Sequence, residues 1–143
     1  GLHAHLVMPK ATGAMLAPML GHWPGPGEDL LNGALPCYNL YPCADGRTLA
    51  VGALEHKFWA LVCGVFERPG WVNQHWQRGL LPNTPESRAL RAEVAALVAA
   101  HPMATWVARF ESVDACVTPV LTLSEALAHP LLADRQQPWM TVD

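Results

Sequence analysis

The sequence predicts an α+β fold, in which a small mixed sheet is flanked by several helices. Two short strand-like segments meet at an Asp-Gly turn within residues 37–53, and several amphipathic segments follow them. Strand-like and helix-like segments do not alternate regularly along the chain. A doubly wound α/β domain is therefore not expected.

The strand pair is predicted from residue types and spacing. Tyr38 to Tyr41 and Thr48 to Val51 are short strand-forming runs, and Asp45-Gly46 lies between them. Asp-Gly tolerates positive φ, so a role in the turn is sufficient to explain Asp45. The two tyrosines are three positions apart and cannot face the same side of a regular strand. Either tyrosine is a candidate pocket residue, and packing in the core or on the surface is the simpler interpretation.

Helices are expected where apolar residues recur at helical spacing. The first runs from about Glu55 to Glu67. Its predicted buried stripe comprises Phe58, Val62, Val65 and Phe66, with Trp59 beside it. Three later helices have clear start signals, which are Thr84-Pro85-Glu86, Pro102 and the capping box Thr122–Glu125, the last helix reaching about His129.

The remaining segments are less regular. Residues 70–83 have no clean period, and short strands are expected at Cys116–Leu121 and Trp139–Val142. Residues 2–22 contain two helix-compatible pieces broken by proline. The Pro/Gly loop that follows them marks a boundary between two structural units.

Composition excludes several classes of protein. The chain has 143 residues, of which 51% are apolar and 15% charged, so it is not disordered. The net charge is −3 and nine Lys plus Arg form no basic cluster, so we expect no nucleic-acid partner. No uninterrupted apolar run reaches the ~18 residues of a membrane helix, and no signal peptide is visible. Four cysteines without a C-x-x-C pair indicate free thiols in a cytoplasmic protein.

Known site motifs are largely missing. His3, His5, His22, Cys37 and Cys43 are too loosely spaced for a zinc site, so no metal is expected. The sequence has no G-x-S-x-G nucleophile elbow and no G-x-G-x-x-G phosphate loop.

Glu55 is the most informative ionisable residue. A strand ends in the small-residue turn Gly52-Ala53-Leu54, and Glu55 follows at the start of a helix. This arrangement directs a carboxylate off the end of a sheet, where a ligand crevice is common. A favourable acid in the first helical turn, contributing about 0.3–1 kcal/mol, is the simpler interpretation from the residues alone.

Two ordered stretches resemble the family III CoA-transferase superfamily, and within it the α-methylacyl-CoA racemases. The first stretch comprises Asn32–Tyr41, Ala44–Gly46 and Val51–Trp59. The second begins with Asp114–Leu121 and continues through Glu125-Ala126, His129-Pro130 and Arg135. The likeness spans about residues 5–143.

The resemblance implies a domain organisation. Proteins of this family combine a large Rossmann-like domain with a small α+β domain in interlocked dimers. Their active site lies between the large domain of one subunit and the small domain of the other. Residues 1–27 would then be the end of a large-domain segment with its linker, and residues 28–143 the small domain, in the C-terminal part of a longer protein. The remainder would come from a missing N-terminal large domain or from the partner in a homodimer.

The resemblance also implies a reaction, which is inversion of the α-carbon of a 2-methylacyl-CoA thioester by proton transfer. A His and an Asp on opposite faces exchange protons through an enolate-like intermediate. Glu55 matches the Glu that orients and charges this His, Tyr38 matches a tyrosine of the acyl pocket, and Leu54 would lie beside Glu55 on its wall. The His and Asp motifs are absent from this sequence, and Gly21-His22-Trp23 does not match the first of them. CoA enters as part of the substrate, and no other cofactor is implied.

Two alternatives remain open. The first is CoA transfer between carboxylic acids, although Asn32–Pro36 lacks the glycine run of many transferases and these often lack an acid at the position of Glu55. The second is a non-enzymatic fragment or assembly module. It is suggested by the absence of the His and Asp motifs, which would supply half of the active site.

Overall fold

Three short strands form the sheet at the centre of the molecule. The structure is a computed structural model that describes Ala17 and residues 29–130. The predictions for the N-terminal helical pieces, the boundary at residues 27 and 28, the three N-terminal histidines and the strand at 139–142 lie outside the described residues.

The strands are β1 (Tyr38–Pro42), β2 (Thr48–Gly52) and β3 (Val117–Pro119), in the order β1-β2-β3. Both pairs are antiparallel, so the described sheet is antiparallel, whereas the sequence predicted a mixed one. A hairpin joins β1 to β2. The chain enters β3 beside the end of β2, where the Gly52 amide donates to the Cys116 carbonyl at 2.8 Å, so β3 runs opposite to β2.

The predicted Asp-Gly turn is confirmed. Gly46 has φ +75°, and the Cys43 amide donates to the Arg47 carbonyl at 2.7 Å. One carboxylate oxygen of Asp45 accepts from the Arg47 amide at 3.1 Å. The other accepts at 3.1 Å from the amide of Met103, the first residue of α4 (Met103–Phe110), so Asp45 ties the hairpin to a helix start.

The other helices begin at the predicted signals. They are α2 (His56–Val65), α3 (Pro85–Val98) and α5 (Leu123–Ala128), with short 3-10 turns η1 (Pro69–Trp71) and η2 (Trp76–Arg78) in the irregular segment. The Thr84 hydroxyl accepts from the Ser87 amide at 3.2 Å at the start of α3. Thr122 and Glu125 form the predicted capping box at α5.

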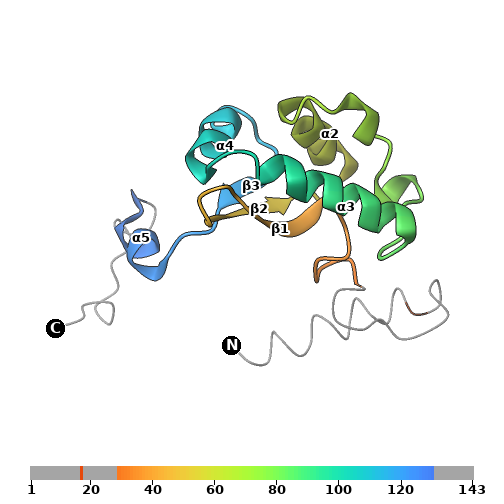
Figure 1. Cartoon of the computed structure of the whole chain (residues 1–143), viewed down its shortest axis with the longest axis horizontal. Coiled ribbons are helices and arrows are strands. Elements are labelled where there is room, and N and C mark those ends of the chain that lie inside the picture. Colours follow the sequence, from red (N-terminus) through yellow and green to blue (C-terminus); the bar gives the residue numbers. More distant parts are fainter. Residues whose placement is uncertain (1–16, 18–28, 131–143) are drawn as a thin grey trace.

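Helices α2, α3 and α4 lie together on one side of the sheet, whereas α5 stands apart on an extended connection (Figure 1). The core between the helices and the sheet includes Leu49 and Val51 from β2. From α2 it takes Trp59, Val62 and Cys63, and from the C-cap of that helix it takes Phe66, while Phe58 and Val65 are half-buried. The buried face of α2 is therefore turned toward Trp59, whose indole N–H donates to the Trp71 carbonyl at 2.9 Å.

Candidate functional site

The face of the sheet that the helices leave uncovered carries a cavity of about 470 Å³, here called the sheet cavity. This volume falls in the range of about 300–1,000 Å³ that is usual for small-molecule pockets. Its lining combines the three strands with the loop before β1 and comprises Leu31, Asn32, Gly33, Tyr38, Asn39, Leu40, Ala50, Val51, Gly52, Cys116 and Thr118.

Strand alternation and register form the floor of the sheet cavity. Tyr38 lies opposite Gly52, and Leu40 lies opposite Ala50, so large side chains on β1 face small residues on β2. Thr118 of β3 pairs with Ala50 on the other side. Partners in register point to the same face. The hollow therefore follows from the small residues of the central strand.

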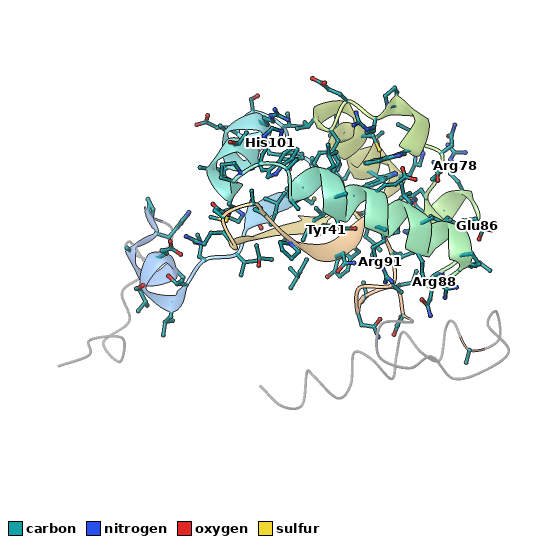
Figure 2. The ribbon with its side chains drawn as sticks, in the orientation of Figure 1. Tyr41, Arg78, Glu86, Arg88, Arg91 and His101 are labelled. Carbon is teal, nitrogen blue, oxygen red and sulfur yellow. The ribbon has the colours of Figure 1, made fainter. Side chains whose placement is uncertain are left out.

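The loop at residues 31–33 forms one wall and is anchored at Gly33. The Gly33 carbonyl accepts from Asn39 Nδ2 at 3.0 Å and from Arg91 Nη1 at 2.6 Å. Arg91 lies on α3 near the loop that precedes β1 (Figure 2). Gly33 has φ +92°, and a Cβ there would approach Asn39 Oδ1 to 3.1 Å, so the tight wall favours glycine.

The two tyrosines of β1 face opposite sides, as their spacing predicted. Tyr41 is 2% exposed and donates its hydroxyl proton to the Pro36 carbonyl at 2.7 Å. Burial raises the pKa of the Tyr41 hydroxyl well above its usual range, so Tyr41 is a neutral core residue. Tyr38 is half-buried and lines the sheet cavity.

Glu55 is exposed and occupies the N-cap of α2, one residue before the first turn in which the simpler interpretation placed it. Its backbone carbonyl accepts from the amides of Phe58 at 3.0 Å and Trp59 at 3.1 Å. Its carboxylate makes no capping hydrogen bond. Within residues 29–130 that carboxylate has no hydrogen bond or ion pair, so it is available to a group outside this part of the chain.

Glu55 lies beyond one end of the sheet cavity, near Cys116. Desolvation, then the charge of Asp114 and then that of Glu55 raise the pKa of the Cys116 thiol, while Lys57 acts in the opposite direction. Cys116 lines the cavity, and Gly52 beside it ends β2. Glu55 is not among the residues that line the cavity, but it follows Gly52, which does line it, by three positions.

Leu54 is half-buried, packs against the core and is not among the cavity residues. The structure thus places Tyr38 in the cavity, with Leu54 and Glu55 on the turn beyond its end. Sequence reasoning missed Leu40, Ala50 and Thr118, although strand alternation puts Leu40 on the same face as Tyr38.

Sequence reasoning also missed the segment His75-Trp76-Gln77, which contacts the turn that carries Glu55. Trp76 Nε1 donates to the Leu54 carbonyl at 2.6 Å, and the His56 amide donates to Gln77 Oε1 at 2.8 Å. No local signal predicts these contacts, because they join residues 22 and 21 positions apart.

Neither a metal centre nor a membrane span is found in the part of the chain that the structure describes. Among these residues no three His, Cys, Asp or Glu side chains are grouped as metal ligands would be. Cys37 and Cys43 are buried free thiols, and burial raises the pKa of Cys37 to about 12. None of the described helices is long and apolar enough to cross a bilayer.

Comparison with known proteins shows the family. The model of CoA-transferase family III matches residues 3–143, and the chain belongs to that family. Among curated proteins, it is 37% identical to the α-methylacyl-CoA racemase of Mus musculus over 114 residues and 34% identical to that of Homo sapiens over 116 residues. Each alignment covers 77% of this chain, which spans about 28% of the length of either racemase.

Solved structures support the fold. The crystal structure of Rv3272 from Mycobacterium tuberculosis matches with a TM-score of 0.56 and 22% identity, over 85% of this chain and 32% of that one. A mutant of the same protein matches with a TM-score of 0.58 and 18% identity, over 85% and 31%. The resemblance to family III and the α+β fold expected from the sequence are thereby confirmed.

Proposed function

We propose that residues 28–143 are the small domain of an acyl-CoA racemase, and that the complete protein inverts the α-carbon of 2-methylacyl-CoA thioesters. The observation that carries this proposal is the carboxylate of Glu55, which is unbonded within the described residues and follows Gly52, a residue of the sheet cavity, by three positions. The similarity to two α-methylacyl-CoA racemases supports the choice of reaction.

In this reaction the α C–H bond breaks as a base takes the proton from one face, and an acid returns a proton to the other face. The thioester carbonyl holds the electron pair as an enolate-like intermediate. A His and an Asp outside this sequence are proposed for these two roles. Glu55 would accept a hydrogen bond from the His ring, which selects its tautomer and stabilises its protonated form.

The acyl group is proposed to meet the sheet cavity. Tyr38 and Leu40 offer an apolar surface there, and Leu40 is 60% exposed within the described structure. Leu54 would contribute to the wall next to Glu55. Burial of an acyl chain against these side chains would contribute about 0.8 kcal/mol per methylene group.

The remaining half of the site is proposed to come from a large domain, in an interlocked homodimer or from an N-terminal part of the same polypeptide. The short span of this chain relative to the racemases supports this arrangement. The reaction needs CoA only as part of its substrate. A cytoplasmic location remains part of the proposal.

Exchange of the α-hydrogen tests the proposal. The full-length protein is incubated with a 2-methylacyl-CoA in deuterated water, and loss of the α-proton and inversion are followed by NMR. We expect Glu55→Gln to lower the exchange rate by about 10²-fold, within the range for acid–base machinery, with little change in thermal stability. The matched control is Glu86→Gln, an exposed acid in the first turn of α3 (Figure 2).

Unchanged exchange in Glu55→Gln would refute the role of Glu55. CoA transfer is the second candidate, because the family model that matches residues 3–143 is that of the CoA-transferases. A protein that moves CoA to a free carboxylic acid without α-proton exchange would establish this alternative. A protein that neither exchanges the α-proton nor binds acyl-CoA would instead be an assembly module.

A further inference from the structure

We propose that Trp76 and Gln77 are positioning residues that keep the Glu55 carboxylate directed away from its own helix. This inference deepens the proposed function and rests on it. It concerns the segment His75-Trp76-Gln77, here called the clamp, which the sequence had left without a role.

The first argument concerns the amides at the start of α2. The first amides of a helix lack partners within the helix, and an N-cap side chain ordinarily accepts from one of them. At α2 the amide of His56, the first helical residue, donates to Gln77 Oε1 at 2.8 Å. The Phe58 and Trp59 amides both reach the Glu55 backbone carbonyl. The amides of His56 and Phe58 therefore have acceptors other than the Glu55 carboxylate, which makes no cap.

The second argument is that the clamp contacts both sides of Glu55. Trp76 Nε1 donates to the carbonyl of Leu54, the residue before Glu55, at 2.6 Å. Gln77 accepts from His56, the residue after it. Two consecutive clamp residues therefore fix the peptide groups on either side of the acid, which restricts the directions its side chain can take.

The third argument is that the clamp itself is held firmly. His75 is 1% exposed, and its Nδ1 accepts from the Gln77 amide at 3.2 Å. The His75 ring meets the His56 ring edge-on at 5.4 Å, and His56 Nε2 lies 3.0 Å from the Val72 carbonyl. Gly79, with φ +98°, closes the turn by donating its amide to the Trp76 carbonyl at 3.1 Å.

Loss of the Gln77 acceptor would leave the His56 amide without a protein partner. The Glu55 carboxylate is the adjacent acceptor, and turning back to the first helical turn would withdraw it from a His outside the domain. A misplacement of about 1 Å in an active site can cost about 10²-fold in rate. Loss of the Gln77 acceptor is therefore expected to lower turnover and to leave the stability of the fold nearly unchanged.

The test compares variants of the full-length protein by kcat and KM for α-proton exchange and by thermal unfolding. Gln77→Met removes the acceptor oxygen and keeps a side chain of similar size. We expect kcat to fall by about tenfold or more, with KM and Tm nearly unchanged. Gln77→Glu, which keeps an acceptor oxygen, is expected to recover most of kcat. The matched control is Gln74→Met, an exposed glutamine whose amide reaches only the Gly70 carbonyl at 3.4 Å.

Trp76→Phe gives an independent measurement, because it removes the indole N–H but keeps an aromatic ring. We expect it to lower kcat in the same way. The decisive comparison repeats Gln77→Met in the Glu55→Gln background. If the clamp acts through Glu55, the second substitution adds little, since effects on a shared partner are not additive.

A kcat for Gln77→Met equal to that of Gln74→Met would overturn the inference. An undiminished effect of Gln77→Met in the Glu55→Gln background would also overturn it. Full exchange in Glu55→Gln alone would remove the proposed role of Glu55 and the inference together. If Glu55→Gln lowers kcat and Gln77→Met does not, the positioning role of the clamp is wrong and the proposed function still stands.

Discussion

Asp45→Ala is expected to loosen two elements that are far apart in the sequence. One Asp45 oxygen accepts from the Arg47 amide and the other from the Met103 amide, each at 3.1 Å. The substitution therefore removes a turn contact and the acceptor at the start of α4 together. The nearby Ala44 amide, which donates to the His101 carbonyl at 3.0 Å, remains as a second tie between the hairpin and that helix.

The magnitude follows from the two contacts. Losing an N-cap acceptor costs about 1 kcal/mol. An exposed turn hydrogen bond contributes at the low end of the usual range, about 0.5–1 kcal/mol. The expected sum for Asp45→Ala is about 1.5–2 kcal/mol, and Asp45→Asn, which keeps one oxygen, should lose roughly half of it.

Hydrogen exchange measures this loss locally in the full-length protein. We expect faster exchange in peptides that cover residues 43–48 and 101–106, by a factor of about 10–30 for Asp45→Ala. Asp114→Ala is the matched control, because Asp114 is exposed and has no hydrogen bond among the described residues. Equal protection in Asp45→Ala and Asp114→Ala would refute the coupling of the hairpin to α4.

Three further predictions concern the cavity, the helix α5 and the core. Ala50→Leu fills the centre of the sheet cavity and should raise KM for acyl-CoA with little loss of Tm, whereas an unchanged KM would place the acyl group elsewhere. Backbone and side-chain hydrogen bonds from Thr122, followed by Arg47 at 2.8 Å, hold the pKa of Glu125 below its usual range. Because the folded pKa is the lower one, this contribution to α5 is present above the unfolded pKa and is lost as pH falls through the folded value. NMR of the α5 amides should follow that loss, and Glu125→Gln should abolish its pH dependence. Trp59→Phe removes the indole donor of the Trp71 carbonyl, which keeps the Gln74 amide at 2.9 Å, and should cost about 0.5–1.5 kcal/mol in thermal unfolding, a loss that full stability of the variant would contradict.

Local side-chain signals explain why much of the fold was predictable. The Asp45-Gly46 turn, the Thr84 cap and the capping box at Thr122 each involve residues within about three positions of one another. Such contacts form between neighbours in sequence, so residue type and spacing are sufficient to predict them. The same reasoning predicted that Tyr38 and Tyr41 face opposite sides of β1.

Periodicity was less informative about which face of α2 is buried. Phe58 and Trp59 are adjacent, and either fits an apolar stripe. Trp59 is buried, and the Trp71 carbonyl accepts its indole N–H inside the core. A buried indole needs such a partner, and only the folded chain shows where one is available.

The sequence by itself determined the hairpin, the helix starts, the family resemblance and the choice of Glu55 and Tyr38, because these depend on neighbouring residues and recognisable motifs. Tertiary structure decided where the site lies. The sheet cavity requires the register that sets Tyr38 opposite Gly52 and Leu40 opposite Ala50. The acceptor for the amide next to Glu55, that of His56, comes from Gln77, 21 residues away. Contacts across such separations depend on how the helices pack on the sheet, which residue spacing does not encode.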